Sequence, residues 1–236
     1  MIIKSQSQIK DYEKGLYLVS TPIGNLKDIT YRAIEVLKDS EIILAEDTRT
    51  SSKLLNHYSI NSKIESYHMH NEHKKLPNII NQLKNGRVVS IISDAGTPGI
   101  SDPGFLLVRE SISNKIDVFC LPGATALIPA LIQSGFPSDR FVFEGFLPQK
   151  KGRHSKLANL AKEKRTVVIY ESPHRILKTL NQFLTYFETK RRISVVRELT
   201  KKYETQFRGT IPDAITYFNE NKPKGEFVIS ISPYLQ

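Results

Sequence analysis

The sequence predicts an α/β protein built from two α/β domains, and three observations lead to this. Short apolar runs typical of strands alternate with amphipathic helical segments along the whole chain. Loops of small residues follow the apolar runs of the first half. The charge changes near residue 121: the first part has 15 Lys+Arg and 14 Asp+Glu (+1), and the rest has 19 and 10 (+9). We therefore expect an N-terminal α/β domain over 1–121 and a basic C-terminal α/β domain over 122–236.

Each element of the first half follows from its hydrophobic period. The segments with the pattern of strands are 15–20, 41–47, 63–68, 87–95 and 115–123. The segments with the pattern of helices are 28–40, 48–58, 76–86 and 105–114. Asp28 is the expected N-cap of the first helix. Strands joined by helices of this length predict right-handed crossovers and a mostly parallel sheet.

The second half continues the alternation with a different ending. Strands are expected at 140–146, 166–172, 191–199, 204–210 and 225–232. Helices are expected at 125–135, 155–164, 174–187 and 211–221. The last strands follow one another like a hairpin or sheet edge, so this domain is not a copy of the first.

Composition limits the classes of protein to consider. The apolar runs are too short to cross a bilayer, and the first residues lack the pattern of a signal peptide. The single cysteine, Cys120, lies in a strand pattern, where we expect a buried structural thiol. These features predict a cytoplasmic protein. The excess positive charge of the second half indicates a polyanionic partner such as nucleic acid, although a basic surface without a partner has the same composition.

Four loops follow strand ends and have unusual chemistry: 20–25, 45–50, 93–104 and 121–127. Ligands of open α/β sheets bind outside the carboxyl ends of the strands. Loop 93–104 combines three glycines with two prolines, so it is stiff and lets bare backbone approach a ligand. The first loop has Pro22 where a phosphate cradle needs an N–H group, so we expect a ligand other than a phosphate. An ordinary tight connection remains the other interpretation of loop 93–104.

Seven motifs in a fixed order carry a resemblance to a known family. They are LVSTPIGNLKDIT, AEDTR, SDAGTPGISDPG, PGATA, EGFLPQKKGR, YESPHR and RELTKKYE. From about residue 15 onward the chain resembles the tetrapyrrole methylase superfamily, and within it the bacterial group that methylates a ribose 2′-oxygen of small-subunit ribosomal RNA. The STPIG and AGTPG loops depart from the usual superfamily pattern of a glycine-rich first loop and a G-D-P turn, and this group shares the departure.

The resemblance implies two α/β domains with S-adenosylmethionine in the cleft between them, a homodimer, and a cytidine of the 16S rRNA decoding region as substrate. The cofactor residues that it implies are Pro22, Ile23, Gly24, Asp94, Gly96, Thr97, Ile100, Thr125 and Ala126, with Tyr170 and Gly225 from the second domain. S-adenosylmethionine has no phosphate, which agrees with the first loop.

Methyl transfer to a ribose hydroxyl is an in-line displacement that a general base accelerates by about 10²–10⁴-fold. Glu46, Asp47 and Arg49 follow a predicted strand and are the candidates for this role; a structural ion pair is the other interpretation of the set. Glu171 and His174 are rival bases from the second domain. His68, His70 and His73 have no Cys or Glu at metal spacing, and the transfer needs no metal, so no metal site is expected.

The loop at 148–154 is the predicted RNA contact, because Lys150, Lys151 and Arg153 can pair with phosphates. A solvated surface loop is the alternative, and the pairs Arg191–Arg192 and Lys201–Lys202 are the next candidates. Three other functions stay open: methylation of a tetrapyrrole, methylation of diphthamide on a protein, and RNA binding without catalysis.

Overall fold

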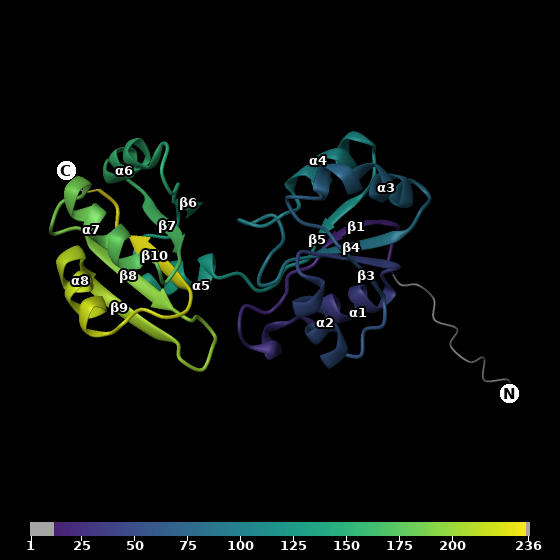
Figure 1. Ribbon diagram of the computed structural model, residues 1–236, viewed down its shortest axis with the longest axis horizontal. Coiled ribbons are helices and arrows are strands. Elements are labelled where there is room, and N and C mark those ends of the chain that lie inside the picture. The colour runs from purple at the N-terminus through teal and green to yellow at the C-terminus, as the bar shows by residue number, and fades with distance from the viewer. Residues whose placement is uncertain (1–11, 235–236) are drawn as a thin grey trace, which may run out of the picture. The chain divides into compact units, whose positions relative to one another are not determined.

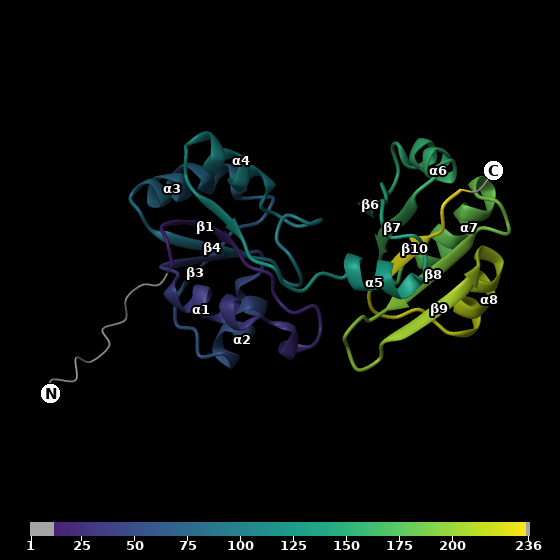
Figure 2. The same cartoon turned by 180° about the vertical axis from the view of Figure 1, so that it is seen from behind.

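The computed structural model describes residues 12–234, which form two compact units (Figures 1 and 2). The first unit runs through Pro22 and resumes over Leu26–Ala124. The second unit contains Ile23–Asn25 and the chain from Thr125 onward. The boundary thus falls a few residues after the one that the charge change predicts, in the loop that follows the last strand of the first unit.

The first unit contains a five-stranded parallel sheet with the order β3-β2-β4-β1-β5. Its strands are β1 (Gly15–Leu18), β2 (Ile42–Ala45), β3 (Lys63–Ser66), β4 (Val88–Ile92) and β5 (Val118–Cys120). Every residue of β1, β2 and β4 is buried, as expected for central strands covered on both faces. The prediction of a mostly parallel sheet is confirmed.

Helices cover both faces of this sheet (Figure 1). They are α1 (Tyr31–Asp39), α2 (Thr48–His57), α3 (Glu72–Lys84) and α4 (Phe105–Ser113). Tyr17 of β1 belongs to the core under α1 and α2, whereas its neighbour Leu16 belongs to the core under α3 and α4. This alternation follows from the two-residue period of a strand.

Three expectations for the first unit were wrong in detail. The short 3-10 helix η1 (Leu26–Asp28) takes up Asp28, so Thr30 caps α1 instead and accepts a 3.0 Å hydrogen bond from the Ala33 N–H. Helix α3 begins at Glu72, before the predicted start at residue 76, and contains Pro77. Cys120 is exposed rather than buried, because it is the last residue of β5, which lies at the edge of the sheet.

The second unit contains a mixed sheet with the order β6-β7-β10-β8-β9, in which only β6 and β7 are parallel. Its strands are β6 (Phe141–Phe146), β7 (Thr166–Glu171), β8 (Arg192–Arg197), β9 (Thr205–Thr210) and β10 (Phe227–Ile231). Its helices are α5 (Leu127–Ser134), α6 (Arg153–Ala161), α7 (Ile176–Tyr186) and α8 (Ile211–Glu220).

One apolar core joins α6, α7 and α8 to this second sheet through residues such as Leu157, Phe183 and Phe218. Helix α5 packs against β7, β8 and β10, where the Ser230 hydroxyl contacts the Ala130 carbonyl at 3.4 Å. Over the described residues, no helix is both long and apolar enough to span a membrane.

Candidate active site

Hydrogen bonds join the loops that leave the carboxyl ends of β1 and β4. The backbones of Thr21 and Gly96 exchange two hydrogen bonds of 2.9 and 3.0 Å, which form a small antiparallel bridge. The Thr21 hydroxyl also donates to the Ser93 carbonyl at 3.0 Å. These hydrogen bonds therefore fix two of the four predicted ligand loops to each other.

Thr97 connects these two loops to the loop after β5. Its hydroxyl donates to the Ala124 carbonyl at 3.0 Å and lies 2.9 Å from the Ser20 hydroxyl. A hydroxyl has one proton, so Ser20 is the donor toward Thr97. Gly123 completes the contact: a Cβ atom at this position would lie 2.6 Å from the Cβ of Ser20.

Loop 93–104 has a backbone that only glycine adopts easily at several positions. Gly96 and Gly99 have φ angles of +89° and +83°, and Ser101 reaches +66° without being a glycine. A Cβ on Gly99 would meet no atom within 4 Å, so its backbone faces open space. The Gly99 N–H donates to the Pro103 carbonyl and the Ile100 N–H to the Thr97 carbonyl, both at 3.2 Å. The loop is thus fixed from within and leaves backbone exposed at Gly99.

The three predicted catalytic residues lie in the turn from β2 into α2, where Asp47 and Arg49 contact each other and Glu46 is not part of this pair. Asp47 is the N-cap of α2 and accepts a 2.8 Å hydrogen bond from the Arg49 N–H. The Arg49 guanidinium also pairs with this carboxylate at 2.9 Å while remaining 88% exposed. These hydrogen bonds from Arg49 lower the pKa of Asp47 to about 2. The contacts of Asp47 and Arg49 are those of a helix cap.

Glu46 is the carboxyl group of this turn whose pKa is raised. It is partly buried, and burial raises the pKa of Glu46 above its usual value; the negative charge of Asp94 adds to the increase, and His68 opposes it. The Asp94 carboxylate also accepts a 3.2 Å hydrogen bond from the Asp47 N–H. The loop after β2 is therefore connected to loop 93–104.

The predicted cofactor residues fall into two groups. Pro22, Asp94, Gly96, Thr97 and Ile100 belong to the first unit, while Ile23, Gly24, Thr125, Ala126, Tyr170 and Gly225 belong to the second.

Tyr170 and Gly225 of the second group have defined local surroundings. The Tyr170 ring contacts those of Phe143 and Phe146, with centroids 4.9 and 5.7 Å away. Gly225 has a φ of +80°, which favours glycine, and a Cβ there would lie 2.3 Å from the Glu198 carboxyl group, which would have to move for any other residue.

The prediction that Arg153 contacts RNA was wrong. The side chain is 4% exposed and donates to Gln182 Oε1 at 2.7 Å, Thr179 Oγ1 at 2.7 Å and the Pro148 carbonyl at 3.0 Å. The guanidinium therefore holds the basic loop in place from within the unit. Lys150 and Lys151, in contrast, are exposed.

Two of the other basic candidates, Arg191 and Lys201, are also bound by groups of the same unit. Arg191 is 5% exposed and donates to three backbone carbonyls, those of Ala161, Glu163 and Ser232. Lys201 pairs with Glu198 at 2.9 Å. No separate sequence signal distinguishes these residues from solvent-facing ones, because their acceptors are carbonyls and carboxylates from other segments.

The rival base Glu171 has its carboxylate fully engaged. It is 1% exposed, lies 2.9 Å from the Arg175 Nε, and accepts a 2.7 Å hydrogen bond from Thr179. We assign it a structural role; His174 is exposed. Within residues 12–234, no three His, Cys, Asp or Glu side chains are grouped as a metal site would require, and His68 contacts the Asn71 amide at 3.0 Å.

Comparison with known proteins defines the class. A family model described as Tetrapyrrole (Corrin/Porphyrin) Methylases matches residues 15–215, and the chain belongs to this family. Solved structures show the same fold at low identity. One is a cobalamin biosynthetic enzyme, cobalt precorrin-4 methyltransferase, with a TM-score of 0.65 and 17% identity over 92% of this chain and 94% of that one. Another is uroporphyrin-III-C-methyltransferase from Thermus thermophilus, with a TM-score of 0.64 and 17% identity over 93% of this chain and 94% of that one.

Curated relatives narrow the class to one group. A protein from Synechocystis sp., named ribosomal RNA small subunit methyltransferase I, is 51% identical over 92% of this chain and 78% of its own length. The protein with the same name from Thermotoga maritima is 45% identical over 92% of this chain and 97% of its own length. The chain is therefore a methyltransferase of the same group within the family, as its motifs predicted.

Proposed function

We propose that the chain transfers a methyl group from S-adenosylmethionine to small-subunit ribosomal RNA, at the ribose 2′-oxygen of a cytidine. The observation that carries the proposal is the 51% identity over 92% of the chain to a relative named for small-subunit rRNA methylation. The choice of a ribose oxygen and a cytidine rests on the motifs alone. We also propose a homodimer on that basis, which light scattering of the purified chain tests.

The residues at the strand ends fit S-adenosylmethionine. This molecule carries an amine, a sulfonium, ribose hydroxyls and an adenine edge, which call for carboxylates, carbonyls and exposed backbone. The linked loops supply the Asp94 carboxylate and the open backbone at Gly99, which has no atom within 4 Å of a Cβ position. When bound, the cofactor supplies an electrophilic methyl group.

The chain's own contribution is to fix the loops and to accept a proton. Ser20, Thr97 and Gly123 hold three loops together, so a ligand meets a preorganised backbone. Glu46 is the proposed proton acceptor for the ribose hydroxyl, since its raised pKa makes it a stronger base than an ordinary carboxylate. Asp47 and Arg49 position Glu46 by capping α2.

Labelled methyl transfer tests the proposal. Small ribosomal subunits from cells that lack the modification receive the purified chain and methyl-labelled S-adenosylmethionine, and we expect label in the RNA. Subunits that already carry the methyl group are the control and stay unlabelled. Transfer to a tetrapyrrole instead of the subunits would contradict the proposal.

A further inference from the structure

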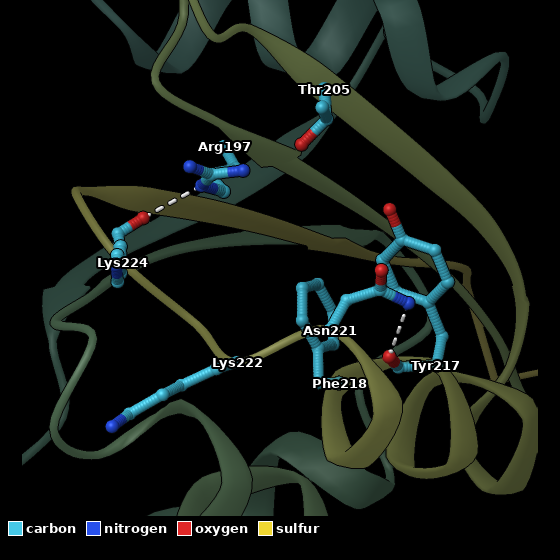
Figure 3. Close-up of a pocket in the computed structure, with 7 residues that line it drawn as sticks. All are labelled: Arg197, Thr205, Tyr217, Phe218, Asn221, Lys222 and Lys224. Carbon is cyan, nitrogen blue, oxygen red and sulfur yellow. Dashed lines mark hydrogen bonds between the residues drawn. The ribbon is translucent and has the colours of Figure 1, made fainter.

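A basic pocket lies in the second unit, between the ends of β8 and β9 and the end of α8 (Figure 3). Its volume is about 390 Å³. It is lined by Arg197, Thr205, Tyr217, Phe218, Asn221, Lys222 and Lys224. Figure 3 shows Arg197 and Lys224 on one side of it and the two aromatic rings with Asn221 on the other. None of the predicted site residues belongs to this pocket.

The cations of the pocket form no close ion pair within the described part of the unit, although the positive charge of Arg197 contributes to lowering the pKa of Glu198. Three of its seven lining residues are cations and none is acidic. In the part of the chain that the structure describes, neither Arg197 nor Lys222 nor Lys224 forms an ion pair, although other cations of the unit do. Lys156 pairs with Glu144 at 2.8 Å, for example. The pocket therefore concentrates positive charge where a concave surface strengthens its field.

One hydrogen bond fixes the orientation of the central cation. Arg197 Nε donates to the Lys224 carbonyl at 2.7 Å, which leaves the two terminal nitrogens of the guanidinium for another acceptor. The adjacent acidic residue, Glu198, is already engaged by the Lys201 ammonium and the Glu226 N–H, both at 2.9 Å. A planar guanidinium held in this way suits the paired oxygens of a phosphate group.

We propose that this pocket binds a phosphate group of single-stranded RNA, with the attached nucleoside beside the ring of Tyr217. The inference rests on the proposed function and extends it by naming a place where the substrate is held. Arg197 and Lys224 are the chain neighbours of Glu198 and Gly225, and Gly225 is a predicted cofactor residue. The three cations of the pocket also belong to the second half of the chain, which has a net charge of +9. RNA is the favoured partner because polar hydroxyl and amide groups accompany the cations.

The test compares two double variants with equal changes in net charge. Lys222→Glu with Lys224→Glu removes two of the three pocket cations. Lys178→Glu with Lys190→Glu changes two exposed lysines that do not line the pocket and serves as the matched control. Binding of a short fluorescein-labelled single-stranded RNA is measured by anisotropy at several KCl concentrations. Circular dichroism verifies that both variants fold.

We expect the pocket variant to bind RNA about tenfold more weakly. Its plot of log affinity against log salt should be shallower by about 0.7, because one phosphate contact on a single strand contributes about that much to the slope. The control should keep the wild-type slope. Arg197→Lys, which keeps the charge but removes the paired donors, should weaken binding with little change in slope. Equal losses in the two double variants would overturn the proposal, because they would reflect net charge alone.

Two further measurements separate this proposal from its alternatives. Calorimetry with inorganic phosphate and adenosine monophosphate tests for a small anion: if the pocket variant loses these ligands but keeps the wild-type RNA slope, the pocket serves a free anion and the proposal is wrong. In the methyl-transfer assay we expect a higher KM for subunits and unchanged affinity for S-adenosylmethionine. If the wild-type chain transfers label and the variant's KM is unchanged, only the pocket proposal fails; if the wild type transfers none, the proposed function fails.

Discussion

Glu46 shows at the scale of one residue how the fold sets chemical behaviour. The strand β2 ends at Ala45, so Glu46 is the first residue beyond the buried sheet. It lies at the edge of the sheet where loop 93–104 also lies. There burial and Asp94 raise its pKa, whereas its neighbour Asp47 has its pKa lowered to about 2 by Arg49. Adjacent carboxylates thus have pKa values shifted in opposite directions, because one lacks the cation that the other holds.

Glu46→Gln should lower the single-turnover rate of methyl transfer by about 10²–10⁴-fold, because an amide cannot accept the proton. Arg49→Ala should cost less than Glu46→Gln, since Arg49 acts only through the cap. Calorimetry should give nearly wild-type affinity for S-adenosylmethionine in both variants. In the wild type the rate should rise with pH as Glu46 ionises. A Glu46→Gln variant with the wild-type rate and the wild-type dependence on pH would show that Glu46 takes no part in catalysis.

The same substitution predicts a change in stability with a defined sign. The pKa of Glu46 is raised in the folded state, so protonation favours folding, and this contribution is lost as the pH rises through the folded pKa. Glu46→Gln mimics the protonated form. It should raise the free energy of unfolding at neutral pH by up to about 1 kcal/mol, since the group is only partly buried, and have no effect at acidic pH. Urea titrations at several pH values measure this; greater destabilisation at neutral than at acidic pH would contradict it.

At the scale of the element, the loops at the strand ends are as important as the strands. The three loops that follow β1, β4 and β5 lie at one edge of the sheet. Hydrogen bonds from Ser20, Thr21 and Thr97 join them into one frame. Glycine is needed there for two separate reasons. Gly123 makes room for Ser20, and Gly99 adopts a positive φ angle beside open space.

Gly123→Ala should disrupt the frame, because the new Cβ would lie 2.6 Å from the Cβ of Ser20. We expect a loss of about 1–3 kcal/mol in unfolding free energy, as for overpacked sites, together with weaker binding of S-adenosylmethionine. Gly99→Ala is the control for stability alone: its Cβ meets no atom and it should cost about 1 kcal/mol from its backbone angle. Equal stability of Gly123→Ala and wild type in thermal unfolding would show that the loops separate freely.

Arg153→Met should destabilise the second unit. The change leaves Gln182 Oε1, Thr179 Oγ1 and the Pro148 carbonyl without this donor, at a cost of about 2 kcal/mol or more. Lys150→Met, in the same loop but exposed, is the control and should leave stability unchanged. Urea unfolding measures both; an Arg153→Met variant as stable as wild type would mean that its hydrogen bonds contribute nothing to folding.

The sequence predicted strands and helices because their periods are local properties. It also predicted the positions of the four loops after strand ends, since each follows an apolar run. It could not separate Arg153 from Lys150 or Lys151, because the acceptors of Arg153 come from α7, distant along the chain. The same limit applies to Cys120, whose exposure depends on β5 being an edge strand. The pocket at Arg197 was also missed, because three separate segments form it.

At the scale of the whole molecule, the positive charge is concentrated in one half of the chain. The first half has a net charge of +1 and carries the frame of loops at the sheet edge, whereas the second half has a net charge of +9. Two of the cations behind this excess, Arg153 and Arg191, are buried within the fold. The cations that remain exposed, with those of the pocket at Arg197, are available for a polyanion.

Alkaline hydrolysis of the RNA after labelled transfer to unmodified small subunits tests directly whether the chain methylates a ribose 2′-oxygen of the ribosomal RNA. A methylated 2′-oxygen cannot attack the adjacent phosphate, so we predict that the label remains in a dinucleotide that resists alkali and has cytidine as its 5′ residue. Label released as a single nucleotide would place the methyl group on a base and contradict the account, and the absence of label in the RNA would contradict it entirely.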